Sequence, residues 1–263
     1  MQIETENKTV LQSSGVPGSL TMGDGEVAVI GIDIGSTTAK IVVFCGEAGC
    51  PAGSGRLVYS CYERHFSQVR PKTLELLRRV QPLVGNRRVR VAISGSAGLG
   101  LARAANIPFV QEVFATAETV RRLEPDTSAV IELGGEDAKI IFFDGGLDER
   151  MNGSCAGGTG AFIDEIASVL NLPIEQFDAA ACRGRTVYDI SGRCGVYAKT
   201  DIQPLLNQGA SRDDLALSAF HAIAKQTLGG LAQGIDVCPP IIFEGGPLTF
   251  NPTLISVFKE RLN

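Results

Sequence analysis

A cysteine in a glycine-rich turn has the surroundings that most directly suggest chemistry in this sequence. Cys155 lies in the stretch Met151–Glu165, where glycines follow it closely and an amphipathic helix is predicted from Phe162 onward. Glycine lets a backbone turn tightly and approach a ligand. The start of a helix presents free N–H groups and a partial positive charge, which suit a phosphate or a deprotonated sulfur. The turn is therefore a candidate for binding an anion or for presenting a thiolate.

A second cysteine has a similar setting farther along the chain. Cys194 lies in the segment Ser191–Gly209, close to glycines on both sides, and a helix is predicted from Val196 to Asn207. The seven cysteines show no regular spacing, which predicts reduced thiols and a cytoplasmic location. The other five are interpreted as buried, unreactive thiols, namely Cys45, Cys50, Cys61, Cys182 and Cys238.

The two histidines of the chain are not close to either of these cysteines in the sequence, which disfavours a zinc site. His65 follows a predicted strand and is interpreted as a structural residue at its end. His221 lies on a predicted helix and is interpreted as an ordinary helix residue.

Two segments of the chain match each other without a gap. Ile32–Phe44 aligns on Ile131–Phe143, which pairs Asp33 with Glu132 and places a lysine seven residues after each. Two copies of one strand–turn–strand unit predict two related lobes, each with a glycine-containing turn and a carboxylate. Such turns, facing one cleft, would grip the phosphates of a nucleotide, with the carboxylates holding Mg²⁺ through water. Two ordinary hairpins with glycine turns are the alternative.

Hydrophobic periodicity predicts the elements that position these residues. The predicted strands are Val27–Ile34, Ile41–Phe44, Leu57–Arg64, Val89–Ser94 and Ile241–Leu248. The predicted helices, besides the one after Cys155, are Thr73–Leu83, Val113–Leu123, Val196–Asn207, a long helix capped at Ser211 and reaching Gln233, and Leu254–Leu262.

Composition describes an ordinary globular chain. Of its 263 residues, 44% are hydrophobic and 20% are charged, so a sizeable core is expected. The net charge of −5 argues against nucleic acid as a partner, and no apolar run is long enough to predict a membrane span. We expect a flexible leader over residues 1–26, a first lobe over 27–120 and a second lobe over 121–263.

Three motifs resemble those of a known superfamily. The segments Asp33–Thr38 and Glu132–Asp137 look like its two phosphate motifs, and Glu244–Gly246 looks like its adenosine motif. This is the superfamily of acetate and sugar kinases, heat-shock chaperones and actin. The resemblance implies an α/β fold of the actin-like, ribonuclease H-like type, with two duplicated lobes and a nucleotide cleft between them.

Three further segments are more specific. Asn152–Gly160, Cys194–Asp201 and Leu205–Gly209 resemble the BadF/BadG/BcrA/BcrD ATPase family, whose members activate 2-hydroxyacyl-CoA dehydratases or drive benzoyl-CoA reductases. The family implies an ATP-hydrolysing homodimer that shares one [4Fe–4S] cluster between subunits. It also implies transfer of a low-potential electron to an iron–sulfur dehydratase or reductase component. By motif position, Cys155 and Cys194 are the cluster ligands.

The same resemblance assigns the nucleotide site. The residues implied near Mg²⁺ and the attacking water are Asp33, Glu132 and Glu136. The residues implied to contact ATP are Gly35, Ser36, Thr37, Thr38, Lys40, Gly134, Gly135, Asp137, Lys139, Gly157, Gly158, Thr159, Gly245 and Gly246.

Two departures from the family pattern alter these expectations. Position 136 is Glu, where the family often has Gln, which would change the hydrolysis rate. Members also continue past the adenosine motif with a further strand and helix, so we expect a chain ending at Asn263 to be a domain of a longer protein. The competing interpretations are a small-molecule kinase of the same fold and a nucleotide-binding scaffold without a redox role.

Overall fold

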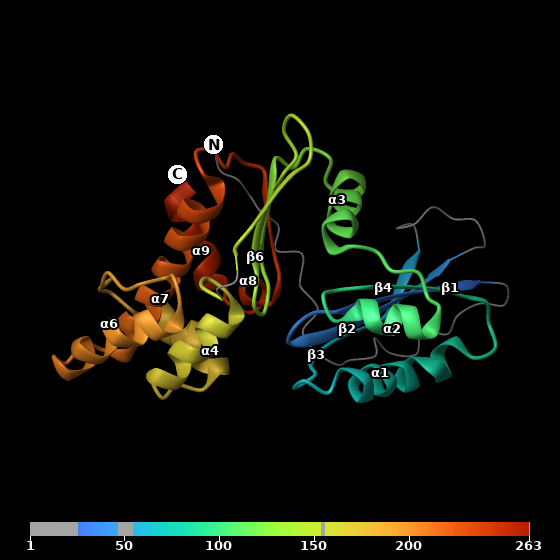
Figure 1. Ribbon diagram of the computed structural model, residues 1–263, viewed down its shortest axis with the longest axis horizontal. Helices are drawn as coiled ribbons and strands as arrows, with labels where there is room; N and C mark the ends of the chain where they lie inside the picture. Colours follow the sequence, from blue (N-terminus) through green and yellow to red (C-terminus); the bar gives the residue numbers. More distant parts are fainter. Residues whose placement is uncertain (1–25, 47–54, 154–155, 263) are drawn as a thin grey trace. The chain divides into compact units, whose positions relative to one another are not determined.

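The computed structural model describes residues 26–46, 55–153 and 156–262, and these divide into two compact units between Ala115 and Thr116. The first unit is built on a sheet in the order β3-β2-β1-β4 (Figure 1). Its strands are β1 (Val27–Ile34), β2 (Thr38–Gly46), β3 (Arg56–Arg64) and β4 (Val89–Ser94). The proposed leader lies outside the described residues, apart from its last residue.

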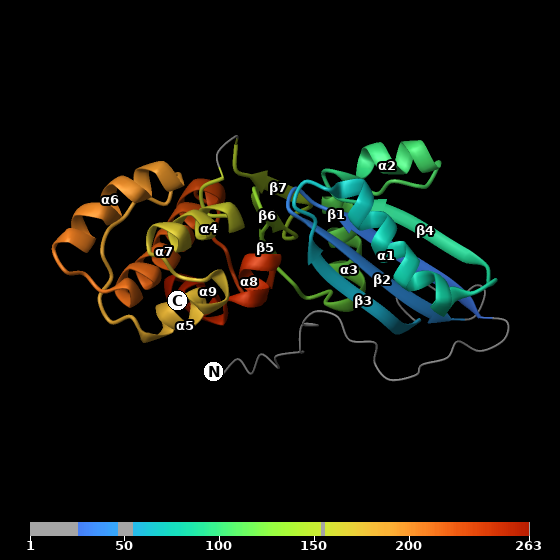
Figure 2. The same ribbon diagram turned by 90° about the horizontal axis from the view of Figure 1, so that it is seen from below.

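The helices α1 (Val69–Val84) and α2 (Gly98–Ala105) complete the first unit. Alternate residues of β1 are buried, from Ala28 to Ile34, because successive side chains of a strand point to opposite faces. Helix α1 lies across the sheet and covers it with Leu76 and Val80 (Figure 2). Burial of these apolar side chains holds β1 and β2 in place beneath their connecting turn.

The second unit is built on a sheet in the order β7-β6-β5-β8. Its strands are β5 (Ala129–Leu133), β6 (Ala138–Phe142), β7 (Asp148–Met151) and β8 (Ile241–Glu244). The helix α3 (Glu112–Leu123) spans the boundary between the units. The remaining α-helices are α4 (Gly160–Val169), α5 (Phe177–Arg183), α6 (Gly195–Asn207), α7 (Arg212–Thr227), α8 (Gly246–Phe250) and α9 (Pro252–Leu262).

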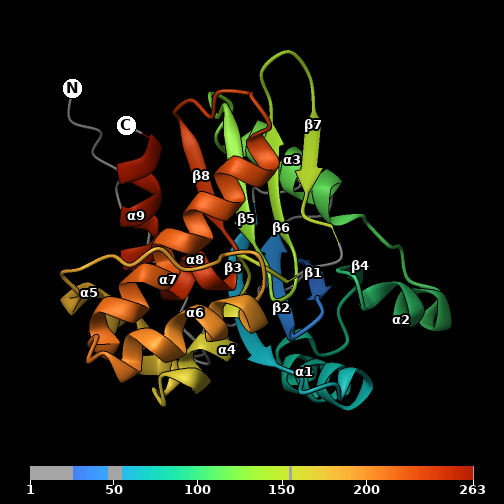
Figure 3. The same cartoon turned by 60° about the vertical axis from the view of Figure 1, so that its left-hand side comes forward.

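Helix α7 forms the centre of the helical layer of the second unit. It packs against α4, α5 and α9, and α6 packs against α4 (Figure 3). The core contains the tilted ring pair Phe177 and Phe220, with ring centroids 5.4 Å apart. Both rings are fully buried, so they contribute strongly to fixing α5 on α7.

The two sheets share one topology. In each, the first two strands pair antiparallel as a hairpin and the first strand pairs parallel with the last strand of the sheet order. In the two hairpins, Asp33 lies opposite Lys40 and Glu132 lies opposite Lys139. The gapless internal match therefore corresponds to two structurally equivalent hairpins, and the expected two-lobed α/β fold is confirmed.

Several boundaries differ from the sequence prediction. The long helix reaches Gln233 as predicted, but its geometry changes: α7 ends at Thr227 and continues as a π-helical turn, Leu228–Ala232, with Gln233 as the C-cap. Its helical start is as expected, since Ser211 Oγ accepts the Asp214 N–H at 3.0 Å. Strand β7 and helices α2, α5 and α8 were not predicted. Because they are short, they carry too little periodicity to be recognised.

No helix among the residues that the structure describes is both long and apolar enough to cross a membrane.

Candidate functional site

The first turn, Gly35–Thr38, joins β1 to β2 and is closed by a hydrogen bond from Gly35 N to Thr38 O of 3.0 Å. At its base, Lys40 Nζ lies 2.5 Å from Asp33 Oδ2. Burial alone would lower the pKa of Lys40, but the Asp33 carboxylate outweighs it and raises the pKa above its usual value. Asp33 Oδ1 is buried and has no hydrogen-bond partner in the described part of the chain. One acidic oxygen is thus left for a ligand, water or cation.

A glycine that the sequence analysis did not single out makes this arrangement possible. Gly95 follows β4 with φ of +91°, and a Cβ there would lie 2.6 Å from Asp33 Oδ1 and 2.2 Å from Ile34 O. No other residue type fits without displacing the end of β1. Gly95 directly follows the predicted strand Val89–Ser94, and a glycine at the end of a strand was the signal that could have identified it from the sequence.

The second turn, Gly134–Asp137, repeats the first. Gly134 N donates to Asp137 O at 2.7 Å. Lys139 is only 3% exposed, and its Nζ lies 3.1 Å from Glu132 Oε1 and 2.9 Å from Asp137 Oδ2. A buried ammonium group requires such partners, so these two carboxylates are held in fixed positions. Glu136 is exposed at the tip of the turn.

Helix α4 begins directly on the second turn. Gly160 N donates to Gly134 O at 2.9 Å, and Ala161 N donates to Gly135 O at 2.8 Å. Two of the N–H groups at this helix start are therefore bonded to protein carbonyls rather than open to an anion. The buried Thr159 hydroxyl donates to Ala156 O at 2.5 Å, so it faces its own turn.

The glycine turn before α4 also touches the segment that carries the second cysteine. A Cβ on Gly157 would lie 2.2 Å from Arg193 O and 2.6 Å from Gly192 O. Gly157 is two residues after Cys155, and Arg193 directly precedes Cys194. Cys155 itself lies outside the described residues. The structure therefore brings together the backbone next to both predicted cluster ligands.

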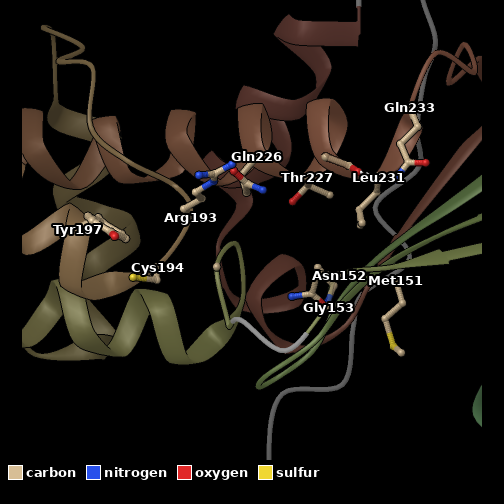
Figure 4. Close-up of a pocket in the computed structure, with 13 residues that line it drawn as sticks. Met151, Asn152, Gly153, Arg193, Cys194, Tyr197, Gln226, Thr227, Leu231 and Gln233 are labelled. Atoms are coloured by element: carbon tan, nitrogen blue, oxygen red, sulfur yellow. Dashed lines mark hydrogen bonds between the residues drawn. The ribbon is translucent and has the colours of Figure 1, made fainter.

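Cys194 is the N-cap residue of α6 and is partly exposed, with no side-chain capping bond. Cys194 lines a pocket of about 400 Å³ between α6, the end of α7 and the Asn152–Gly153 segment (Figure 4). Among the described residues, no three His, Cys, Asp or Glu side chains gather closely enough to hold a metal ion.

The other cysteines only partly match their interpretation. Cys45 and Cys61 are buried as expected, but Cys182 and Cys238 are exposed. Cys182 lies in the last turn of α5, and Cys238 lies in the connection before β8. Burial raises the pKa of the Cys45 thiol to about 11, which makes it unreactive. Cys50 lies outside the described residues.

The third predicted motif lies beside the second turn. Gly245 follows β8 with φ of +92°, and a Cβ there would lie 2.0 Å from Leu133 O. Glu244 lies opposite Glu132 in the parallel pair β5–β8. A Cβ on Gly160 would lie 3.5 Å from Pro247 Cγ. In the second unit, the second turn, the glycine turn before α4 and the start of α8 therefore converge, while Asp33, Lys40 and the first turn belong to the first unit.

Comparison with known proteins places this geometry in context. Residues 30–260 match the BadF/BadG/BcrA/BcrD ATPase family. The 2-hydroxyisocaproyl-CoA dehydratase activator of Clostridioides difficile is 26% identical over 157 residues, which are 59% of this chain and 58% of that protein. The (R)-2-hydroxyglutaryl-CoA dehydratase activating ATPase of Acidaminococcus fermentans is 27% identical over 124 residues, 46% of this chain and 47% of that protein. The matches thus span about half the length of these curated relatives.

Solved structures show the same fold. Component A of the A. fermentans (R)-2-hydroxyglutaryl-CoA dehydratase superposes with a TM-score of 0.74 and 21% identity, over 90% of this chain and 89% of that one. The activator of the Clostridium difficile 2-hydroxyisocaproyl-CoA dehydratase, with bound ADPNP, gives a TM-score of 0.76 and 24% identity, over 90% of this chain and 86% of that one. The sequence motifs, the duplicated hairpins and the match over residues 30–260 agree, and this chain belongs to the BadF/BadG/BcrA/BcrD ATPase family.

Proposed function

We propose that this chain is an ATP-hydrolysing activator that couples ATP hydrolysis to delivery of a low-potential electron. The recipient is an iron–sulfur component of an acyl-CoA dehydratase or reductase. The curated relatives support this proposal, because they are named as activators of 2-hydroxyacyl-CoA dehydratases. A cytoplasmic location is part of the proposal, since free thiols persist in a reducing compartment.

The observation that carries the proposal is the direct connection between the second turn and both cysteine segments. Helix α4 is hydrogen-bonded to Gly134 O and Gly135 O, and the turn before it presses Gly157 against Arg193. A change at the second turn would therefore reach the backbone at Gly157 and Arg193, two residues after Cys155 and one residue before Cys194. A small-molecule kinase has no use for this connection.

For Mg·ATP, we propose that both turns bind phosphate and that the two acidic residues at their bases orient Mg²⁺ and water. The unpartnered Asp33 Oδ1 supports this role, because a buried carboxylate oxygen without a protein partner is normally satisfied by water or a cation. Glu132 is held by Lys139 and would orient water rather than coordinate Mg²⁺ directly. Gly245 and Gly246 are proposed to lie against the adenosine, as the resemblance assigns them. The remaining nucleotide contacts are proposed as the resemblance assigns them.

For the cluster, we propose that Cys155 and Cys194 of each subunit in a homodimer are the four ligands. The donor chemistry fits, because two thiolates from each of two chains satisfy a [4Fe–4S] cluster. The α6 helix start at Cys194 fits as well, because its partial positive charge favours a negatively charged group. When bound, the cluster would accept and pass on one electron. In this arrangement, a change at the second turn would reach the cluster ligands through the start of α4 and the contact between Gly157 and Arg193.

Anaerobic reconstitution with iron and sulfide tests the proposal. The wild-type chain should bind about two iron atoms per chain, as a shared cluster requires. Cys155→Ser and Cys194→Ser should abolish iron binding and leave ATP binding intact. Cys182→Ser and Cys238→Ser are matched controls, because both thiols are exposed and belong to neither motif. Full iron content in Cys155→Ser would overturn the electron-transfer role and leave the kinase or scaffold alternative.

A further inference from the structure

His65 directly follows β3 and is buried against the first turn. Its side chain is 3% exposed. Its backbone N–H donates to Thr37 O at 3.1 Å, and its ring Nε2 lies 3.0 Å from Gly35 O. The histidine therefore contacts the first turn through both its backbone and its side chain.

The partners of the ring determine its protonation pattern. Gly35 O is a carbonyl and can only accept, so Nε2 must carry the proton and donate. Ser67 N can only donate and lies 3.1 Å from Nδ1, so Nδ1 must accept. Both ring nitrogens are thus used, and the ring is the neutral Nε2–H tautomer. A residue that only filled space would not need both bonds.

The second of these bonds holds an unfavourable backbone conformation. Phe66 and Ser67 have φ values of 47° and 62°, which are left-handed and uncommon for residues other than glycine. Phe66 is 77% exposed, so burial of its ring does not compensate for this strain. The hydrogen bonds from Ser67 N to His65 Nδ1 and from Gln68 N to His65 O, at 2.7 Å, hold the segment that leads into α1. One imidazole thereby connects the first turn to the start of a packed helix.

The second unit also has a polar residue directly after the third strand of its sheet. Asn152 directly follows β7, the third strand of its sheet, as His65 follows β3. Asn152 N donates to Ala138 O at 3.0 Å, and its Oδ1 accepts the Ala138 N–H at 2.9 Å. Asn152 thus holds the first residue of β6, whereas His65 reaches the turn itself at Gly35 and Thr37.

We infer that His65 is a positioning residue for nucleotide phosphate, acting through Gly35. The inference rests on the proposed function, because it assumes that the first turn binds phosphate. The N–H of Gly35 is bonded to Thr38 O and its carbonyl to His65, so both of its backbone polar groups are fixed. The orientation of the turn is then set before the ligand arrives, which lowers the entropic cost of binding.

Two amide variants separate this role from a structural one. The side-chain amide of Gln reaches the position of Nε2, so His65→Gln keeps a donor for Gly35 O. The shorter Asn reaches only the position of Nδ1, so His65→Asn keeps an acceptor for Ser67 N. Both variants lose the imidazole ring and gain a side-chain amide, so their stabilities should be similar. Thermal unfolding of each full-length variant checks that they are.

Titration calorimetry with Mg·ATP is the measurement. We expect His65→Gln to bind within about threefold of wild type, and His65→Asn to bind at least about tenfold more weakly, as loss of one positioning hydrogen bond implies. In wild type, the ring ¹⁵N shifts should report a neutral Nε2–H tautomer.

The possible outcomes distinguish a failure of the inference from a failure of the proposed function. Wild-type chain that fails to bind Mg·ATP overturns the proposed function, and the inference with it. Wild-type binding with equal affinities for the Gln and Asn variants overturns the inference alone. A wild-type ring that carries its proton on Nδ1 also overturns it.

Discussion

At the scale of single residues, the two acid–lysine pairs are equivalent in position but not in surroundings. The Lys139 side chain is 4% exposed and contacts two carboxylates, Glu132 and Asp137. The Lys40 side chain is 32% exposed and contacts Asp33. The second pair is therefore held more rigidly, whereas Asp33 retains one oxygen without a hydrogen bond. This difference suggests that Asp33 is the carboxylate that ligand chemistry depends on.

We expect Asp33→Asn to lower the ATPase turnover of the chain by at least about tenfold, through loss of a charged oxygen that positions metal and water. The substitution keeps the size of the side chain, so the hairpin should remain folded. Asp189→Asn is a matched control, because Asp189 forms an exposed ion pair with Lys225 and belongs to neither turn. Steady-state phosphate release measures the turnover of both variants. Turnover equal to wild type in Asp33→Asn would exclude the first turn from catalysis.

At the scale of elements, an ion-pair network joins β3 to α1 below the first turn. Arg79 Nη1 lies 2.5 Å from Glu63 Oε1, and Lys72 Nζ lies 3.0 Å from Glu63 Oε2. The hydrogen bond from Arg79, aided by Lys72 and opposed by burial, lowers the pKa of Glu63 to about 2. The network ties the strand that precedes His65 to the helix that follows it.

The lowered pKa of Glu63 predicts that its contribution to stability depends on pH. A carboxylate whose pKa is lower in the folded state stabilises the fold above its unfolded pKa, and that contribution is lost as the pH falls through the folded value. The stability difference between wild type and Glu63→Gln should therefore be largest at neutral pH and shrink from about pH 4.5 toward pH 2. Urea unfolding at several pH values measures it.

Glu118→Gln provides a comparison for this series, because Glu118 forms an exposed pair within α3. Exposed pairs of this type contribute little, so its stability should follow wild type at every pH. A stability difference between wild type and Glu63→Gln that stays constant across the pH range would contradict the lowered pKa of Glu63.

The two glycines that flank Cys155 provide a second test at this scale. A Cβ on Gly157 would clash with the Arg193 carbonyl, whereas a Cβ on Gly153 would meet nothing within 4 Å. Gly157→Ala should separate the two cysteine segments and reduce the iron bound on reconstitution, because the clash is with backbone. Gly153→Ala should retain the wild-type iron content. Equal iron in both variants would show that this contact does not position the ligands.

At the scale of the whole molecule, the two proposed ligands Cys155 and Cys194 supply half of the roughly four thiolates that a cluster needs, so the proposed cluster requires a second copy. Two exposed apolar residues, Val196 and Tyr197, follow Cys194 on α6 at 68% and 63% exposure. Exposed apolar side chains beside a proposed shared site are consistent with a surface that another subunit covers.

We therefore expect association to depend on the metal. Anaerobic sedimentation should show a dimer for the reconstituted chain and a shift toward monomer after iron is chelated, because a shared cluster links the subunits. Cys194→Ser should sediment like the chelated wild-type chain under all conditions, and Cys182→Ser should behave as wild type. A reconstituted chain that binds iron as a monomer would contradict the shared cluster.

Much of the local structure could be predicted from sequence. The hairpins, their opposed acid and lysine, and the helix starts at Gly195 and Ser211 depend on residues that are near neighbours in the chain. Periodicity and capping chemistry report such relations directly. Prediction was weaker where helices were short, and it did not foresee that the last turn of the long helix, Leu228–Ala232, is π-helical.

The sequence by itself thus determined the fold class, the duplicated turns and the two cysteine segments worth testing. Only the tertiary structure decided which segments touch: His65 on Gly35, Gly157 on Arg193, and Gly245 on Leu133. The physical reason is that a pattern shows which face of a segment is buried but not which distant segment covers it. A glycine or a histidine fits many environments, and its role is set by the backbone brought against it in the folded chain.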